Sequence, residues 1–98
     1  MSMYVIASLT IKDAVRFEDY RRMLLPTMAK YGAQLVARGG PIVLEGEWPR
    51  ERLIIAEFPS MEQARAWYRS PEYATALAVR DKALARDLIL VDGTVIAS

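Results

Sequence analysis

The chain has 98 residues, 53% of them apolar, which is the size of a single domain (residues 1–98) with a real hydrophobic core. Its 13 basic and 12 acidic side chains leave a net charge of +1, which argues against nucleic acid or an anionic membrane surface as a partner. The absence of cysteine and histidine excludes disulfides, thiolate metal sites, thiol nucleophiles and imidazole bases.

The first predicted element is a strand over residues Tyr4–Ile11. It is rich in Val, Ile and Leu, and apolar residues occupy both of its alternating faces, which is typical of a central strand covered on two sides. The apolar stretch ends by Lys12, so it is too short for a signal peptide or a membrane span. Together with the missing cysteine, this predicts a cytoplasmic protein.

The next segment is predicted to form a helix from Ala14 to Lys30, with Asp13 as its N-cap and Gly32 as its C-terminal stop. Pro26 lies inside this pattern and lacks a backbone donor, so we expect a kink or a break into two pieces there. The apolar face of the helix is formed by Phe17, Tyr20, Leu24, Met28 and Tyr31.

Two strand-like pieces, Gln34–Arg38 and Ile42–Glu47, flank the sequence Gly39-Gly40-Pro41. Glycine permits unusual backbone angles and proline cannot donate to a neighbouring strand, so these pieces predict one bent or bulged edge strand. After a turn at residues 48–51, Arg52–Phe58 again has apolar residues on both faces and is predicted to be the second central strand.

The C-terminal part contains two helix starts. Ser60 with Gln63 matches a capping box, and Ser70-Pro71-Glu72 provides an N-cap, a proline at the first helical position and an acidic first turn. The second of these helices is predicted to run from Pro71 to about Ala85. Leu88–Val91 is predicted to close the chain as the last strand, with a possible continuation through Val95–Ile96.

The resulting order is β-α-β-β-α-β with the second helix split in two, which predicts an α+β, ferredoxin-like sandwich with an antiparallel sheet and helices on one face. Right-handed crossovers place the first and third strands at the centre of the sheet. These strands are apolar on both faces, but the helices cover only one. The uncovered face would expose an apolar patch, so we expect a homodimer that forms through the helix-free sheet face.

A resemblance supports this architecture. It is carried by short segments whose order and spacing span nearly the whole chain, namely Tyr31-Gly32, Arg38-Gly39-Gly40, Leu44-Glu45-Gly46-Glu47-Trp48-Pro49, Glu57-Phe58-Pro59-Ser60 and Ala66-Trp67-Tyr68-Arg69-Ser70-Pro71-Glu72-Tyr73. Together they resemble the domain-of-unknown-function 1330 family. The resemblance implies a subunit of the dimeric α+β barrel superfamily, whose members include cofactor-independent oxygenases, isomerases and small stress-related proteins. It implies no catalytic residues for this chain.

No cofactor and no metal site is expected. The carboxylates of Glu45, Glu47 and Glu51 lie near one another in the sequence, but alternate strand residues point the same way without converging on a cation. Gly39-Gly40 before a proline is better explained as a bulge than as a phosphate-binding loop.

The candidate site residues are polar groups at positions where the pattern predicts a dry environment. Arg80 lies on the buried stripe of the last helix, Glu57 ends a central strand, and Arg38 and Glu45 lie on the neighbouring strand. These groups either pair with one another or reach water with their tips. Alternatively, Arg38 or Arg80 binds the carboxylate or enolate of a small ligand, with Glu45 or Glu57 as a base whose pKa is raised by burial.

Aromatic side chains present the same choice between core and ligand contact. Tyr31, Trp67, Tyr68 and Tyr73 are candidate ligand-binding residues, although aromatics at helical spacing are more often core. The sequence thus predicts a crevice between sheet and helices for a small organic acid or aromatic compound. A cofactor-independent enzyme, a non-catalytic binding or sensing dimer and a purely structural dimer all remain open.

Overall fold

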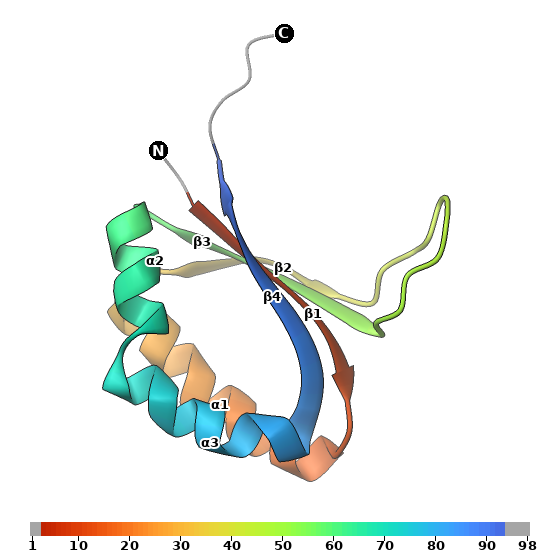
Figure 1. The fold of residues 1–98 in the computed structure, drawn as a ribbon, viewed down its shortest axis with the longest axis horizontal. Coiled ribbons are helices and arrows are strands. Elements are labelled where there is room, and N and C mark those ends of the chain that lie inside the picture. Colours follow the sequence, from red (N-terminus) through yellow and green to blue (C-terminus); the bar gives the residue numbers. More distant parts are fainter. Residues whose placement is uncertain (1–2, 94–98) are drawn as a thin grey trace, which may run out of the picture.

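The structure of the protein, a computed structural model, describes residues 3–93. Its elements follow the predicted βαββαβ order, and the second helix is split as expected (Figure 1). The elements are β1 (Met3–Ile11), α1 (Ala14–Lys30), β2 (Gln34–Gly39), β3 (Arg52–Phe58), α2 (Met61–Tyr68), α3 (Pro71–Ala83) and β4 (Leu84–Asp92).

The strands form one antiparallel sheet in the order β2-β3-β1-β4, so the prediction that the first and third strands are central is confirmed. All three helices lie on the same side of this sheet (Figure 1). Both edges of β1 and β3 are paired with other strands, and one face of each is packed under the helices, so their second apolar face lies on the side that these helices leave open.

Side chains alternate strictly between the two faces of the sheet. Along β1, Met3, Val5, Ala7 and Leu9 are buried under the helices and form the core with residues of α1, α2 and α3. The opposite side, here called the helix-free face, carries an apolar patch that runs across three strands. The patch consists of Tyr4, Ile6, Leu53, Ile55, Ile89 and Val91.

The helix α1 begins where the sequence predicts, because the side chain of Asp13 accepts hydrogen bonds from the backbone amides of Val15 and Arg16. It continues through Pro26 to Lys30, so the predicted break into two pieces does not form. Pro26 is exposed, and the carbonyl that loses its intrahelical donor belongs to the exposed Arg22, where water can replace the missing bond.

The two short helices are capped by Ser60 and Ser70, whose hydroxyls accept from the amides of Gln63 and Tyr73 as predicted. The last helix ends at Ala83 rather than near residue 85, and β4 starts directly at residue 84 instead of 88. Residues 84–87 pair with the end of β1 and therefore belong to the strand. The predicted continuation through residues 95–96 lies outside the described residues.

The predicted strand Ile42–Glu47 is wrong. Residues 40–51, here called the arm, form no strand and project from the end of the β2–β3 pair (Figure 1). Pairing of β2 with β3 stops at Gly39 opposite Leu53, so the arm has no neighbouring strand to bond. The irregularity of β2 lies within that strand instead, where the register shifts between Leu35 and Ala37.

Within residues 3–93, no helix has both the length and the apolar character needed to cross a membrane.

Candidate functional site

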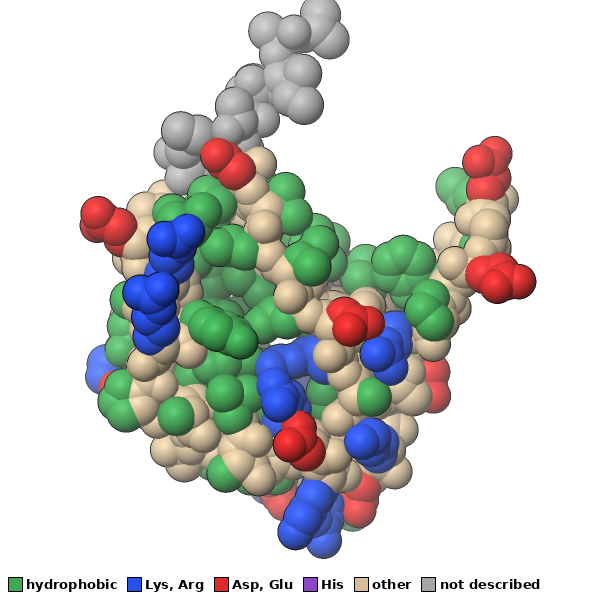
Figure 2. All heavy atoms as spheres, viewed as in Figure 1, with side chains coloured by type: hydrophobic (Ala, Val, Ile, Leu, Met, Phe, Trp, Pro, Cys, Tyr) green, Lys and Arg blue, Asp and Glu red, His purple; other side chains and the backbone are tan. Residues whose placement is uncertain are grey.

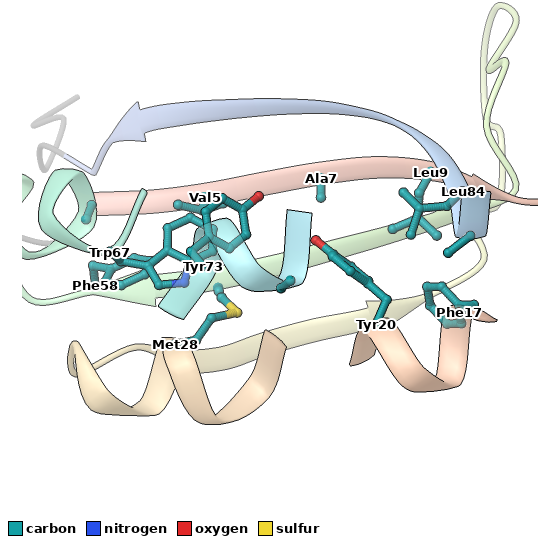
Figure 3. Close-up of a cluster of buried hydrophobic side chains, with 14 of the residues drawn as sticks. Val5, Ala7, Leu9, Phe17, Tyr20, Met28, Phe58, Trp67, Tyr73 and Leu84 are labelled. Atoms are coloured by element: carbon teal, nitrogen blue, oxygen red, sulfur yellow. The ribbon is translucent and has the colours of Figure 1, made fainter. Parts of the chain in front are cut away.

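Trp67 of α2 is the centre of the buried aromatic cluster (Figure 3). Only 2% of its surface is exposed, and its ring centroid lies 4.3 Å from that of Tyr73 and 5.4 Å from that of Phe58. The indole Nε1 donates to the buried Thr27 Oγ1 at 3.0 Å, and this hydroxyl donates in turn to the carbonyl of Leu24 at 2.6 Å. The chain of bonds fixes the orientation of the indole ring against α1.

A cavity of about 50 Å³, here called the inner cavity, lies between the sheet and α1. Its lining is almost entirely apolar and includes Val5, Ala7, Ile54 and Met28. The charged side chains that reach it are all arginines, Arg21, Arg38 and Arg86, and no carboxylate of the described residues lines it. The electrostatic potential of this cavity therefore favours an anion.

Arg86 is the most unusual residue of the inner cavity. It occupies a helix-facing position of β4, opposite Leu9, in a row with Leu84 and Leu88. Its Nη1 donates to the hydroxyl of Tyr20, from α1, and its Nη2 donates to the hydroxyl of Tyr73, from α3.

The two tyrosines approach the guanidinium from opposite directions. Figure 3 shows their hydroxyl oxygens pointing into the same space beneath Ala7. The guanidinium carbon of Arg86 lies 5.8 Å from the ring centroid of Tyr20 and 5.7 Å from that of Tyr73, within range of a cation–π contact. Arg86 forms no ion pair with a carboxylate of residues 3–93. A partly buried cation is thus held by neutral partners alone.

Burial raises the pKa of Tyr20 well above its ordinary value of 10, and this effect outweighs the opposing one of Arg86. The nearby Tyr73 raises that pKa further. Tyr20 is therefore a neutral hydroxyl at physiological pH. Even if one of the two hydroxyls donates to the other, one O–H group remains free to donate, next to N–H groups of Arg86 that the tyrosines do not use.

A larger hollow of about 390 Å³, here called the outer groove, lies between α2 and β4. Arg65 and Tyr68 of α2, with its C-cap Arg69, form one wall, and Leu88 and Leu90 of β4 form the other. Figure 2 shows hydrophobic side chains gathered around a hollow on this side of the molecule, with basic side chains beside it. The groove and the inner cavity share Val5, Trp67 and Leu88, so these residues form the wall between them.

Three of the predicted site residues line these two spaces, and a fourth, Tyr73, bonds Arg86 beside them. Arg38 lines the inner cavity from an exposed position on β2, and no hydrogen bond or ion pair holds it within the described residues. Trp67 lines both spaces, and Tyr68 lines the outer groove. Tyr73 holds Arg86.

Two other candidates are engaged elsewhere. The hydroxyl of Tyr31 donates to Glu72 at 3.3 Å, beside the pair formed by Lys30 and Glu72. Arg80 donates to its neighbour Asp81 at 3.0 and 3.1 Å and lines neither space. Arg80 thus forms an internal ion pair, which was one of the alternatives, and its charge still acts to lower the pKa of Tyr20.

The predicted bases also lie away from the two spaces. Glu57 is on the helix-free face, where its hydrogen bond raises the pKa of Tyr4, and Glu45 is exposed in the arm. Sequence reasoning missed Arg86 because the helix was predicted to run to about Ala85 and the strand to begin only at Leu88, so Arg86 was assigned to neither element. The signal was a single charged residue in the alternating row Leu84, Arg86, Leu88, which becomes visible once the strand boundary is known.

Residues 3–93 contain no group of three or more acidic side chains placed so that they could hold a metal ion.

Comparison with solved structures identifies proteins of the same fold. RPA0582 from Rhodopseudomonas palustris, a protein of unknown function, has a TM-score of 0.81 at 20% identity and covers 97% of this chain and 84% of its own. SnoaB from Streptomyces nogalater, a cofactor-independent oxygenase, has a TM-score of 0.70 at 12% identity, with coverages of 97% and 95%. A dimeric protein with a ferredoxin-like fold from Bacteroides fragilis has a TM-score of 0.63 at 13% identity, with coverages of 93% and 95%.

These identities are low, so the similarities establish the fold alone. No curated protein matches the sequence. The family described as "Domain of unknown function (DUF1330)" matches residues 2–94, which is nearly the whole chain. The chain therefore belongs to the DUF1330 family, as its sequence motifs suggested.

Proposed function

We propose that the protein binds a small organic acid or phenol with an apolar body in the crevice formed by the inner cavity and the outer groove. One observation carries this proposal: Arg86 places a cation in an almost entirely apolar cavity, and no described carboxylate neutralises it. Desolvating a cation is costly unless a partner of opposite charge repays the cost. An anionic oxygen next to Arg86 would supply that partner.

The sizes of the two spaces indicate how such a ligand would lie. The inner cavity, at about 50 Å³, holds only a small part of an organic molecule, whereas the outer groove, at about 390 Å³, is in the range of small-molecule sites. The acidic oxygen would meet Arg86 and the free tyrosine hydroxyl, and the apolar body would lie against Trp67 and Leu88. A ligand that occupies both spaces needs the wall of Val5, Trp67 and Leu88 between them to open, and Leu88 is the one residue of these three that is not buried.

A second candidate function is a cofactor-independent enzyme. Preorganised N–H and O–H donors next to a buried apolar space are suited to stabilise an enolate or phenolate as its charge develops. Arg86 with Tyr20 and Tyr73 provides such donors, and the fold is shared with a cofactor-independent oxygenase. Glu57 and Glu45 lie away from the cavity, so no carboxylate base of residues 3–93 is at hand. This reading therefore fits substrates whose enol or phenol is acidic enough to lose its proton to water, with the resulting anion stabilised by Arg86.

The binding proposal is tested by thermal unfolding with 2-naphthoate, 2-naphthol and the uncharged 2-naphthamide. We expect the acid to raise the melting temperature with increasing concentration and the amide to have a much smaller effect. In Arg86→Met, the loss of charge-assisted hydrogen bonds worth about 1.5–3 kcal/mol should weaken acid binding about 10- to 150-fold.

Arg16→Met is the matched control, because Arg16 is exposed on α1 and pairs with Asp13 away from the cavity. Unchanged acid binding in Arg86→Met would contradict the proposal, as would the absence of any effect of acids and phenols on the wild type. Turnover of a bound compound, lost in Arg86→Met while the amide still binds, would select the enzymatic reading.

We also propose that the protein forms a homodimer through the helix-free face. The patch of Tyr4, Ile6, Leu53, Ile55, Ile89 and Val91 is apolar, and no helix within residues 3–93 covers it. Several proteins of the same fold are described as dimeric, including the one from Bacteroides fragilis. Ile55→Arg places a charge in this patch and should give monomers in sedimentation equilibrium. A variant that stays as dimeric as the wild type would refute this interface.

A further inference from the structure

The arm carries large apolar side chains that are largely exposed to solvent. Ile42 is 87% exposed and Leu44 is 91% exposed, and Trp48 exposes 48% of its surface. Figure 2 shows hydrophobic and acidic side chains along the arm, which stands clear of the body of the molecule. Apolar side chains as exposed as Ile42 and Leu44 are stabilised by a cover from outside the chain.

The arm points to the side of the sheet where a second copy is proposed to lie. Figure 3 shows it rising from the sheet away from the helices, on the side of the helix-free face. Its root is fixed to that face, because Arg50 Nη2 lies 3.1 Å from Asp87 Oδ2, and Asp87 is paired with Ser8 on the helix-free side of β1. The apolar patch and the arm thus flank the same region of space.

The size of the helix-free face supports a role for the arm in covering it. Four strands spaced by about 5 Å, and at most nine residues long, give a flat face of about 600 Å². A stable interface of standard size buries about 800 Å² on each partner. The arm adds the exposed side chains of Ile42, Leu44 and Trp48 beside this face, and packing them against a partner would enlarge the contact.

From these observations we propose that the arm clasps a second copy of this chain, with Ile42, Leu44 and Trp48 packed against the flank of the partner subunit. In a twofold dimer both arms do so at once, because the same surface is used by each copy. This inference rests on the dimer proposed above and adds a second contact region to it. The central sheet contact and the peripheral arm contact can then be disrupted separately.

The first test compares dimer dissociation constants, measured by sedimentation equilibrium, for the wild type and the double variant Ile42→Ser/Leu44→Ser. We expect the dissociation constant of the double variant to be at least about 10-fold higher than that of the wild type. Its circular dichroism and its thermal unfolding at high concentration should stay those of the folded protein. Val15→Ser is the matched control, because Val15 is 73% exposed on α1 and should leave the constant within about twofold.

The outcomes separate the arm from the underlying dimer. If Ile55→Arg gives monomers and the arm variant dissociates like the wild type, the arm proposal is wrong and the dimer stands. If the wild type is a monomer at micromolar concentrations, both proposals fail.

A second test uses the absence of cysteine from the chain, which makes single labelling sites simple to introduce. Leu44→Cys, labelled with a benzophenone maleimide and mixed with an isotopically heavy copy, should give light–heavy crosslinks on irradiation. Val15→Cys should give none. Crosslinks from Leu44→Cys that stay within one copy would overturn the proposal.

Discussion

The hydrogen bond between Trp67 and Thr27 allows a quantitative prediction for Thr27→Val, which removes a hydroxyl and keeps the shape of the side chain. The indole Nε1 then loses its acceptor at 3.0 Å, at a position where Trp67 is 2% exposed and water has little access. The carbonyl of Leu24 keeps its helical partner, so only one donor is left without a bond. An unpaired buried donor costs about 1–3 kcal/mol in the free energy of unfolding.

This cost translates into a large change of melting temperature. A chain of 98 residues has an unfolding entropy of about 0.2 kcal/mol/K, so each kcal/mol shifts the midpoint by about 5 °C. Thr27→Val should therefore melt about 5–15 °C below the wild type in calorimetry. All variants are compared at one protein concentration, because association also stabilises the fold.

Thr75→Val is the matched control for this substitution. The hydroxyl of Thr75 donates to the carbonyl of Pro71 at 3.1 Å on the exposed side of α3, so its removal should cost less than about 0.5 kcal/mol. A double-mutant cycle with Trp67→Phe should give a coupling energy of about 1 kcal/mol or more between positions 27 and 67. Equal effects of the two threonine substitutions, together with no coupling, would refute the reasoning.

Two further predictions concern pH. Tyr20 has a raised pKa, so it stays protonated in the folded chain, whereas the unfolded chain releases this proton near pH 10. Above about pH 10, the free energy of unfolding of the wild type, measured by urea titration, should therefore fall more steeply with pH than that of Tyr20→Phe. Equal slopes would contradict a buried, neutral Tyr20. The second prediction concerns Glu72, whose hydrogen bond with Lys30 lowers its pKa from the ordinary value of 4.5. Ionised Glu72 therefore stabilises the folded chain above pH 4.5, and this stabilisation is lost as the pH falls through the lowered pKa. Between about pH 5 and 2, Glu72→Gln should therefore lose less stability than the wild type, and an identical acid profile would show that the pair contributes nothing.

The architecture was predictable because its determinants are local or periodic. Apolar residues on both faces of Tyr4–Ile11 and Arg52–Phe58 indicated central strands, and the observed strand order confirms this. Ser60 and Ser70 indicated the helix starts because a cap is decided by residues within one turn. The general preference of helically spaced aromatics for the core holds for Trp67, which is buried, but not for Tyr68, which is 56% exposed.

The arm and the α3–β4 boundary were not predictable for the opposite reason. Ile42-Val43-Leu44 has strong strand propensity, but a strand needs a neighbour with free backbone groups, and that depends on the tertiary arrangement. Residues 83–86 contain good helix formers and no Gly or Pro, yet pairing with β1 draws residues 84–86 into the sheet. Arg86 was overlooked as a consequence, since only the strand assignment places it among the helix-facing residues.

The direct passage from α3 into β4 joins the two regions discussed above. Arg86 faces the helices and binds Tyr20 and Tyr73, whereas the next residue, Asp87, faces the other way and holds Arg50 at the root of the arm. Successive side chains of a strand point to opposite faces from one backbone, so a displacement of the backbone at residues 86–87 would move both contacts together. We therefore expect ligand binding in the proposed crevice and the proposed contact of the arm with a partner subunit to be coupled through the peptide unit between Arg86 and Asp87.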